Sequence, residues 1–449
     1  MRHAAIIDIG KTNVKLALVD LDSLTEVAVR TSPNLVRPGP PWPHFDTEAQ
    51  WAFLCGALRE MAASHGVDAI GVTTHGACAA LLDAGGGLAA PVLDYEHDGP
   101  DSCRTEYDAI RPAFAETGSP ALPRGLNLGA QLFWQLRAEP GLRDRVRHVV
   151  MWPQYWGHRL TGALASDICS LGCHTDLWNP QARGFSSLPA ALGLADRMAP
   201  PRMPGEVLGT LLPGLQADLG IGPVPVICGL HDSNASLLPH LLARQAPFAV
   251  VSTGTWVISM AVGGHHVALD PARDTLINVN ALGDPVPSAR FMGGREYEVI
   301  RAGRVAAPTQ ADADAILNAG VMLLPAVVPD SGPFQGRHSR WTTDPANDAQ
   351  REVALGYYLA LMTAESLAQI GAEGPSVIEG PFAANPWFCA MLQAATGRGV
   401  ERSAMRTGTA IGTAMLLRRE AVPARRAPDM GAPDPGLIRY ALRWRDLAG

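Results

Sequence analysis

Residues 4–13 read AAIIDIGKTN, and a second apolar run, VKLALV, follows at residues 14–19. An apolar run, a polar turn that contains glycine and a returning apolar run predict a β-hairpin. The pattern recurs at residues 249–260, AVVSTGTWVISM, with Gly254 in the place of Gly10. The two glycines are 244 residues apart, slightly more than half of the 449-residue chain. A repeat near half-length predicts two related domains.

Helical patterns separate and follow the two hairpins. Residues 51–65 and 352–370 carry apolar side chains at helical spacing, and a glycine follows each run. Strands that are followed by such helices predict an α/β fold.

A proline-containing segment marks the expected domain boundary. Pro239 and Pro247 lie just before the second hairpin. Because proline lacks an N–H group and breaks helices, we expect the last helix of the first domain to be interrupted near Pro239. The predicted division is an N-terminal lobe, residues 1–243, and a C-terminal lobe, residues 244–449.

The composition points to a small-molecule partner. The chain has 36 Lys and Arg against 43 Asp and Glu, a formal net charge of −7, and 18% of its residues are charged. Nucleic-acid binders gather basic residues against phosphates, so we expect no nucleic-acid partner. Seven scattered cysteines without a CxxC pair argue against a disulfide framework. No apolar stretch approaches the roughly 18 residues of a membrane helix, so we expect a cytoplasmic protein with no membrane partner.

The turn of the first hairpin is a candidate phosphate site. Main-chain N–H groups around Gly10 can approach phosphate oxygens, and Thr12 and Asn13 can add side-chain donors. Asp8, at the end of a strand, could hold Mg²⁺ through water. The alternative is a polar hairpin tip with a solvated Lys11.

A second candidate follows the apolar residues 224–228, which predict a buried strand. Residues 229–232 read GLHD, so Asp232 stands at the carboxyl end of that strand. Ligand crevices of α/β sheets occur at such strand ends. The alternative is that Asp232 only caps the helix that begins at Ser233.

Two further candidates lie in the second half of the chain. The turn of the second hairpin contains Thr253, Gly254 and Thr255 and mirrors the first. Residues 379–385 read EGPFAAN and follow a predicted strand at residues 376–378. Each segment is also explained as an ordinary loop.

The order and spacing of these segments resemble the sugar-kinase branch of the actin-like ATPases. Specifically, the chain resembles the FGGY carbohydrate kinases over most of residues 4–418, and GLHD before Ser-Thr-Gly-Thr-Trp is the most specific match. The resemblance implies an α/β fold of two actin-like (ribonuclease H-like) lobes with a central cleft. Residues 407–414 are similar to a small-residue helix that closes the second lobe.

The resemblance also implies roles for the candidate residues. Asp232 would be the catalytic base, and Asp8 together with Asp232 would hold Mg²⁺. The two hairpins would bind the phosphates of ATP, and the later loop would hold its adenosine. The implied nucleotide-binding residues are Gly10, Lys11, Thr12, Asn13, Thr253, Gly254, Thr255, Gly380, Pro381 and Asn385.

The sugar is expected in the first lobe. The implied substrate-binding residues are His75, Gly76, Asp94, Glu96, Gln154, Tyr155 and His231. Many family members carry Trp-x-Asp-x-Arg where residues 94–98 here read DYEHD, and Gly-Gly where Gly380 and Pro381 stand. These departures concern the recognised hydroxyl pattern and the nucleotide base.

The implied reaction is the transfer of the γ-phosphoryl group of ATP to a terminal hydroxyl of a ketose. The first hairpin looks most like members that act on L-fuculose or L-rhamnulose, and a pentulose is a further expectation. Two alternatives are a polyol kinase for glycerol or erythritol, and a regulatory actin-like ATPase that is not a kinase. The prediction leaves room for a homodimer.

Overall fold

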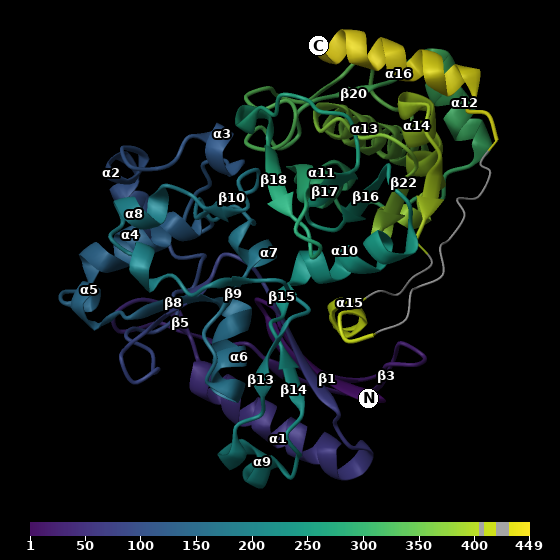
Figure 1. Ribbon diagram of the computed structural model, residues 1–449. Helices are drawn as coiled ribbons and strands as arrows, with labels where there is room; N and C mark the ends of the chain where they lie inside the picture. The colour runs from purple at the N-terminus through teal and green to yellow at the C-terminus, as the bar shows by residue number, and fades with distance from the viewer. Residues whose placement is uncertain (404–407, 419–430) are drawn as a thin grey trace. The chain divides into compact units, whose positions relative to one another are not determined.

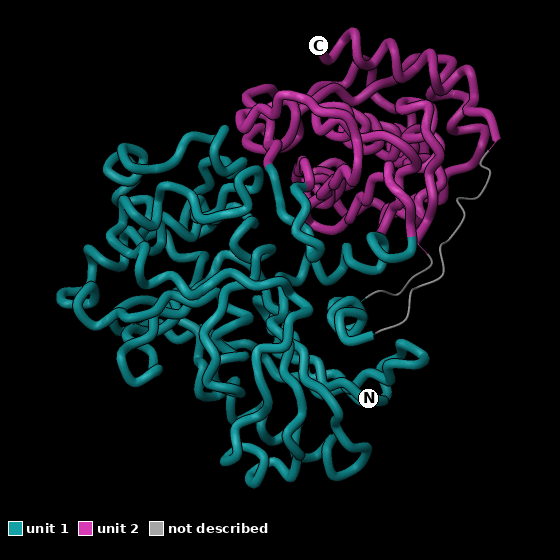
Figure 2. The backbone as a smooth tube through the Cα atoms, viewed as in Figure 1, with its two compact units in different colours: residues 1–243, 277–285, 407–423 teal, residues 244–276, 286–406, 424–449 magenta. Residues whose placement is uncertain are grey.

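The computed structural model describes residues 1–403, 408–418 and 431–449. The chain forms two compact units, coloured separately in Figure 2. The first unit comprises Met1–Ala243, Ile277–Pro285 and Thr407–Pro423, and the second comprises Arg244–Leu276, Val286–Arg406 and Ala424–Gly449. The chain first leaves the first unit after Ala243, at the predicted boundary. Two later segments, Ile277–Pro285 and Thr407–Pro423, nevertheless belong to the first unit, so the units are not divided at a single point in the sequence.

The sheet of the first unit begins with the predicted hairpin. β1 pairs antiparallel with β2, with Ile9 opposite Val14, and in parallel with β6, with Ile6 opposite Gly71. The strand order is β13-β14-β6-β1-β2-β3, and β15 pairs with β6 beyond this path. The strands are β1 (His3–Ile9), β2 (Asn13–Asp20), β3 (Thr25–Pro33), β6 (Ala69–Thr74), β13 (Val207–Thr210), β14 (Pro225–Ile227) and β15 (Leu230–His231).

The sheet of the second unit repeats this arrangement. β16 pairs antiparallel with β17 and in parallel with β22, and the order is β18-β19-β17-β16-β22-β23. The strands are β16 (Phe248–Thr253), β17 (Val257–Val262), β18 (Thr275–Val279), β19 (Pro285–Phe291), β22 (Ser376–Glu379) and β23 (Val400–Arg402). Residues 277–279 of β18 and Pro285 of β19 fall in the range that is assigned to the first unit. Since each sheet joins an antiparallel hairpin to parallel strands, the predicted internal repeat is confirmed.

Helices and short strands surround the two sheets (Figure 1). The helices of the first unit are α1 (Thr47–His65), α2 (Arg104–Asp108), α3 (Phe114–Thr117), α4 (Leu128–Ala138), α5 (Leu142–Arg145), α6 (Trp152–Thr161), α7 (Ile168–Leu171), α8 (Leu188–Ala191), α9 (Pro213–Leu219), α10 (Asp232–Ala243) and α15 (Thr409–Met415). Those of the second unit are α11 (Gly293–Arg301), α12 (Gln310–Ala319), α13 (Asp348–Gln369), α14 (Pro386–Thr396) and α16 (Pro435–Ala448). The short strands are β4 (Val36–Arg37), β5 (His44–Phe45), β7 (Ala79–Leu82), β8 (His148–Met151), β9 (Ser166–Asp167), β10 (Trp178–Asn179), β11 (Gly184–Phe185), β12 (Pro201–Arg202), β20 (Leu323–Leu324) and β21 (Arg340–Trp341).

The two helices predicted from periodicity are present, and each begins four residues earlier than expected. α1 begins at Thr47 because Asp46 accepts a hydrogen bond from the Ala49 N–H at 3.1 Å. α13 begins at Asp348 because Asn347 accepts one from the Gln350 N–H at 2.8 Å. These side chains satisfy backbone donors that the first turn of a helix leaves free.

The small-residue helix lies in the first unit and not, as expected, in the second lobe. α15 packs on β1, β6 and α10, with Ala410 and Ala414 in one apolar cluster with Ala4 and Ile6 (Figure 1). Its alanines and glycine allow this close approach to the sheet. Thr407, the first residue of the predicted helix, lies outside the described residues.

The prediction that Pro239 interrupts its helix is wrong, because α10 continues through Pro239 to Ala243. Proline at this position leaves the carbonyl of Ala235 without its helical N–H partner. That carbonyl lies against Gly412 of α15, where a Cβ atom would come within 1.8 Å of its oxygen. α10 therefore continues past Pro239, and the close packing of α10 against α15 depends on Gly412.

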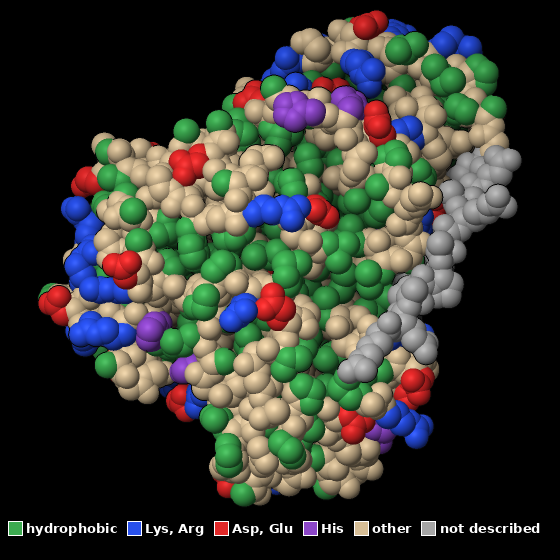
Figure 3. Space-filling model, viewed as in Figure 1, with side chains coloured by type: hydrophobic (Ala, Val, Ile, Leu, Met, Phe, Trp, Pro, Cys, Tyr) green, Lys and Arg blue, Asp and Glu red, His purple; other side chains and the backbone are tan. Residues whose placement is uncertain are grey.

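On the face that Figure 3 shows, acidic and basic side chains are interspersed. Across residues 1–403, 408–418 and 431–449, none of the helices has both the length and the apolar character needed to cross a membrane.

Candidate active site

Three strands of the first unit end at one edge of its sheet. Thr74, the last residue of β6, pairs with Ile9 of β1 on one side and with His231 of β15 on the other. The residues that follow these strands therefore emerge side by side. They are the turn of the first hairpin, His75 and Asp232, so the structure brings together three segments that the sequence singled out.

Asp232 is the first residue of α10, so its carboxylate lies at the positive end of the helix dipole. Its Oδ1 accepts a hydrogen bond from the Ser233 N–H at 2.6 Å and lies 3.2 Å from Nε2 of His231. The side chain is 30% exposed. Gly229 lets the chain reach this point, because its φ is 83° and a Cβ atom would lie 2.3 Å from the carbonyl oxygen of Val72.

His75 presents an unpartnered nitrogen beside this carboxylate. Its Nδ1 lies 2.9 Å from the carbonyl oxygen of Gly76, so Nδ1 carries the proton and Nε2 accepts. Nε2 is buried without a hydrogen-bond partner among the described residues. Burial lowers the pKa of His75 to about 4, so the imidazole is neutral at pH 7. The rings of Phe45, Tyr95 and Trp152 lie 5.1, 5.3 and 6.4 Å from its own.

His231 links Asp232 to a buried thiol. Its Nε2 lies 3.9 Å from Sγ of Cys173, and Gly76 makes room for the ring, since a Cβ there would lie 2.6 Å from Nε2. Burial disfavours the charged imidazole, but the charges of Cys173 and Asp232 outweigh this and raise the pKa of His231. The ring is therefore a hydrogen-bond donor fixed beside Asp232, and Cys173 is a neighbour that the sequence did not reveal.

Asp8 is a buried carboxylate whose charge is only partly compensated. It accepts a hydrogen bond from the Thr409 hydroxyl, yet burial raises its pKa, and the nearby charge of Asp232 adds to the rise. A carboxylate whose charge is disfavoured by a neighbouring carboxylate is one that a divalent cation would stabilise. The described residues contain no group of three or more His, Cys, Asp or Glu suited to a metal ion. Mg²⁺ usually needs only one or two carboxylates besides water and substrate phosphates, so Asp8 and Asp232 fit this ion.

The tip of the first hairpin is held from below by Asn34, a residue that the sequence analysis missed. Its side chain donates to the Gly10 carbonyl at 2.7 Å, and its N–H donates to the Thr12 carbonyl at 2.9 Å. The Gly10 N–H donates to the Asn13 carbonyl and closes the turn. Thr12 and Asn13 remain exposed, so their side chains are available to a ligand.

Lys11 does not extend from the hairpin tip. Its ammonium group pairs with Oδ1 of Asp94 and lies 3.2 Å from Oε2 of Glu96. All three residues were predicted site residues, but Lys11 was predicted beside phosphate and the two acids beside sugar. The structure joins them in one cluster, and a phosphate contact of Lys11 stays a prediction.

Gln154 and Tyr155 lie deeper than a surface contact would require. Gln154 is fully buried, and its Nε2 donates to the carbonyl of Cys228 at 2.8 Å, which holds the end of the β14 segment. Tyr155 stacks on Trp152 with ring centroids 5.4 Å apart, and its hydroxyl lies 3.5 Å from Nη1 of Arg159. Both side chains support the site from the core, and their predicted sugar contacts stay untested.

In the second unit, Thr253 ties the second hairpin to the loop after β22. Its hydroxyl lies within 3.1 Å of the Phe382 N–H, from which it accepts, and it donates to the Glu379 carbonyl. Gly380 makes this possible, because its φ is 80° and a Cβ would lie 1.9 Å from the carbonyl oxygen of Thr253. Gly254 and Thr255, next along the hairpin, are exposed.

A cavity of about 680 Å³ opens beside this junction, within the range of 300 to 1,000 Å³ typical of small-molecule sites. It brings together four predicted nucleotide-binding residues. Its lining residues are Gly254, Thr255, Gly294, Tyr297, Glu298, Arg301, Ala306, Pro308, Glu352, Pro381, Phe382, Ala384, Asn385, Pro386 and Trp387. The cavity lies wholly within the second unit, so a nucleotide-sized ligand has room there.

Asn385 shapes this cavity through the backbone. Its Oδ1 accepts from the N–H groups of Trp387 and Phe388 at 3.0 and 3.1 Å and so begins α14. Sequence reasoning missed the wall formed by Tyr297 and Arg301 of α11, whose guanidinium lies 5.5 Å from the tyrosine ring. A tyrosine and an arginine spaced i and i+4 were the available signal, but this spacing also fits an ordinary surface helix.

Glu296, next to Tyr297 on α11, is buried with only neutral partners. Its oxygens accept from the Val328 N–H and the Tyr358 hydroxyl, each at 3.0 Å. Burial raises the pKa of Glu296 to about 7. The folded state therefore favours the protonated acid, and this stabilisation is present at pH below the ordinary value and is lost as the pH rises through 7.

We expect Glu296→Gln to remove this pH dependence. From pH 5 to pH 8 the wild-type free energy of unfolding should fall by about 2 to 3 kcal/mol more than that of the variant, since one pKa unit is worth about 1.4 kcal/mol. Denaturant unfolding at both pH values measures the difference. Exposed Glu298, two residues along, is the control, and an equal effect of Glu298→Gln would contradict the assignment to Glu296.

Family models match both parts of the chain. Residues 3–239 match the N-terminal domain of the FGGY family of carbohydrate kinases, and residues 245–426 match the carbohydrate kinase FGGY C-terminal domain. A carbohydrate kinase from Novosphingobium aromaticivorans, known from its crystal structure, is 35% identical, covers 99% of this chain and 100% of its own, and superposes with a TM-score of 0.92. The prediction of an α/β fold with two actin-like lobes is confirmed.

Curated relatives match over a shorter range. The L-fuculokinase of Salmonella typhi is 28% identical over 268 residues, 58% of this chain and 56% of its own length. The xylulose kinase of Escherichia coli K12 is 27% identical over 266 residues, 57% of this chain and 53% of its own length. The matched region thus spans about half the length of these relatives. The two family models and the full-length likeness show that the chain belongs to the FGGY family of carbohydrate kinases.

Proposed function

We propose that this protein is an ATP-dependent sugar kinase that phosphorylates a terminal hydroxyl of a ketose, with Asp232 as general base. The observation that carries the proposal is the convergence of Asp232, His75 and the first hairpin at one sheet edge. Family membership and the names of the curated relatives, an L-fuculokinase and a xylulose kinase, support a ketose such as L-fuculose, L-rhamnulose or a pentulose.

The two substrates are divided between the two units in this proposal. The first unit binds the sugar, where neutral His75 offers a hydrogen-bond acceptor to a hydroxyl and His231 a donor. The second unit binds ATP in its cavity, with Pro381 and Asn385 near the nucleoside and Gly254 and Thr255 near the phosphates.

Transfer requires a positioned acceptor and a group that takes its proton. The Asp232 carboxylate accepts the proton of the sugar hydroxyl as the hydroxyl oxygen bonds to the γ-phosphorus. The bond between that phosphorus and the bridging oxygen of ADP breaks, and ADP carries away the electron pair. His231 keeps the carboxylate oriented through the 3.2 Å contact with its Oδ1.

Asp8 and Asp232 are the residues that would hold Mg²⁺. The ion, when bound, offsets charge on the phosphate oxygens. Asp8 is fixed for this role by the Thr409 hydroxyl, and its raised pKa reflects burial and the neighbouring Asp232 charge that a cation would offset.

Two other functions remain distinguishable by their acceptors. A polyol kinase would form ADP with glycerol or erythritol, and a regulatory ATPase would form ADP equally without any acceptor. The general-base position of Asp232 beside a hydrogen-bonding histidine favours a kinase over the regulatory ATPase.

A panel experiment tests the proposed function. We expect Mg-ATP and one ketose among L-fuculose, L-rhamnulose, D-xylulose and L-ribulose to raise ADP release at least tenfold over the rate without acceptor. EDTA in excess of Mg²⁺ should abolish the response. A larger response to glycerol or erythritol would favour the polyol kinase, and no dependence on acceptor would contradict the kinase proposal.

A further inference from the structure

Lys11, Asp94 and Glu96 form what we call the Lys11 cluster. The Lys11 ammonium pairs with Asp94 and with Glu96, so two carboxylates share one cation. It also lies over the rings of Tyr95 and Phe45, 4.9 and 5.2 Å from their centroids. The lysine side chain is only 21% exposed, so its charge is fixed in place and does not move freely in solvent.

The Lys11 cluster adjoins the acceptor site. Phe45 and Tyr95 lie under the Lys11 ammonium and also pack on His75, at 5.1 and 5.3 Å between ring centroids. The charges of Lys11 and Asp232 both act on the His75 imidazole. A sugar that contacts His75 would therefore lie close to the cluster.

The charges within the Lys11 cluster sum to a negative value. One lysine faces two carboxylates, so the cluster carries a net charge of −1, and the charges of Asp8 and Asp232 are not counted because Mg²⁺ would offset them. Neutral sugar hydroxyls can donate to these oxygens. A carboxylate on the acceptor would instead be repelled by these two carboxylates. Lys11 would not compensate this repulsion, because its ammonium group already pairs with Asp94 and Glu96.

We propose that the Lys11 cluster selects the charge class of the acceptor, admitting neutral polyhydroxy sugars and rejecting sugar acids. The proposal rests on the proposed function for the placement of the acceptor. Glu96 is the adjustable member, since its side chain is 53% exposed while that of Asp94 is 11% exposed. Removing the Glu96 charge leaves Lys11 with one carboxylate partner and frees part of its charge for an anionic acceptor.

Opposite changes in the cluster should shift specificity in opposite directions. With D-xylulose or L-fuculose as the neutral acceptor and D-gluconate or D-xylonate as the acid, we expect Glu96→Gln to raise the ratio of kcat/KM for acid over neutral about tenfold. Like charges a few ångströms apart near a surface are worth this order of energy. Lys11→Met should lower the same ratio. If Lys11 only bound phosphate, Lys11→Met would reduce both kcat/KM values equally.

Glu106 provides the matched control, because its side chain is also 53% exposed and it pairs only loosely with Arg137 at 3.9 Å. Glu106→Gln should leave the ratio unchanged. A wild-type preference for the acids, or a shift with Glu96→Gln no larger than with Glu106→Gln, would overturn the proposal.

Binding without ATP separates this proposal from the proposed function. Dissociation constants for the same sugars and acids, measured by calorimetry on the whole protein, should show the same tenfold shift for Glu96→Gln. If no acceptor stimulates ADP release, the proposed function fails. The ratio of the dissociation constants for acids and neutral sugars still tests the proposed role of the Lys11 cluster. Equal ratios in the wild type and in Glu96→Gln would overturn that role.

Discussion

Asp232→Asn is expected to lower kcat for sugar-dependent ADP release by about 10² to 10⁴-fold, the contribution typical of a general base. Asparagine keeps the shape of the side chain and can still accept from the Ser233 N–H, but its amide cannot take the proton of a sugar hydroxyl. Stability should change little, since the carboxylate is 30% exposed. Initial rates with the preferred ketose and a thermal unfolding curve measure both effects.

The control for this prediction is an aspartate at another helix start. Asp434 accepts from the N–H groups of Gly436 and Leu437 at the beginning of α16, and asparagine serves equally well there. Asp434→Asn should keep wild-type turnover. ATP binding should survive in Asp232→Asn, because the cavity that we propose for the nucleotide lies in the second unit. Near-normal turnover of Asp232→Asn would remove Asp232 from its proposed role.

The fold was largely predictable because its deciding signals are local. Two apolar runs around Gly10 and around Gly254 specify hairpins from adjacent residues alone, and both hairpins are present. The place of α15 was not predictable, since it depends on how Ala410 and Gly412 meet a sheet and a helix more than 160 residues away in sequence. The prediction for Pro239 was wrong for the same reason. How much a proline destabilises α10 depends on the surroundings of the Ala235 carbonyl oxygen, which loses its helical N–H partner and lies against Gly412.

The candidate site was predictable where residues follow strands. His75 and Asp232 stand directly after β6 and β15, so strand order alone brings them together. Side-chain direction was not predictable from the motif. Lys11 lies in the expected turn, yet it turns to Asp94, 83 residues away in sequence. Asn34 was missed because a lone asparagine after a strand carries no signal until the hairpin tip it supports is known.

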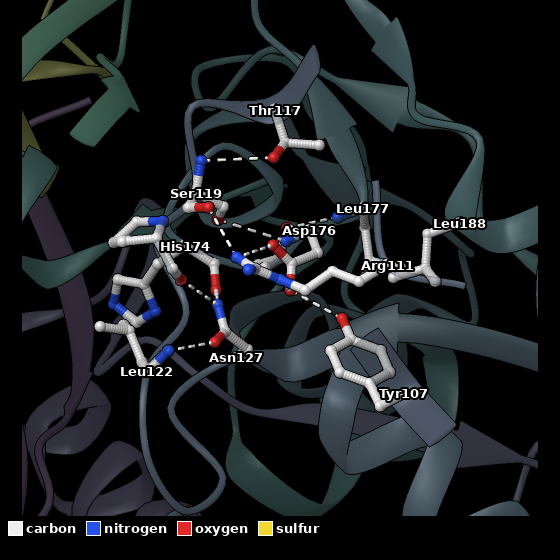
Figure 4. Close-up of polar contacts among 12 residues, drawn as sticks. Tyr107, Arg111, Thr117, Ser119, Leu122, Asn127, His174, Asp176, Leu177 and Leu188 are labelled. Carbon is white, nitrogen blue, oxygen red and sulfur yellow. Dashed lines mark hydrogen bonds and ion pairs between the residues drawn. The ribbon is translucent and has the colours of Figure 1, made fainter. Parts of the chain in front are cut away.

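A buried polar cluster in the first unit holds the loop that precedes β10 (Figure 4). The Asp176 carboxylate is fully buried and accepts from Nε and Nη2 of Arg111, both at 3.0 Å, and from the Tyr107 hydroxyl at 2.6 Å. Asn127 donates to the carbonyl of His174 at 3.0 Å. Cys173, the neighbour of His231, is carried by the same loop.

Asp176→Asn is expected to destabilise the protein by about 3 to 5 kcal/mol, since breaking a buried ion pair leaves one charge uncompensated. Asparagine isolates the charge, because it keeps the side-chain shape and tolerates the positive φ of 64° at this position. The Arg111 guanidinium, only 14% exposed, would keep its charge without the carboxylate. Urea unfolding monitored by tryptophan fluorescence measures the loss.

Two variants show whether the uncompensated charge is the cause. Asp284 pairs with Arg183 at 3.0 Å on the surface, where both side chains are more than half exposed, so Asp284→Asn should cost no more than about 1 kcal/mol. Arg111→Met combined with Asp176→Asn should be more stable than Asp176→Asn alone, because it removes the buried charge. If Asp176→Asn costs no more than Asp284→Asn, or if the double variant recovers nothing, the ion pair does not hold this loop. A displaced loop should also affect the candidate active site, because Cys173 on this loop contacts His231. We therefore expect kcat/KM of Asp176→Asn to fall even at temperatures where the protein stays folded.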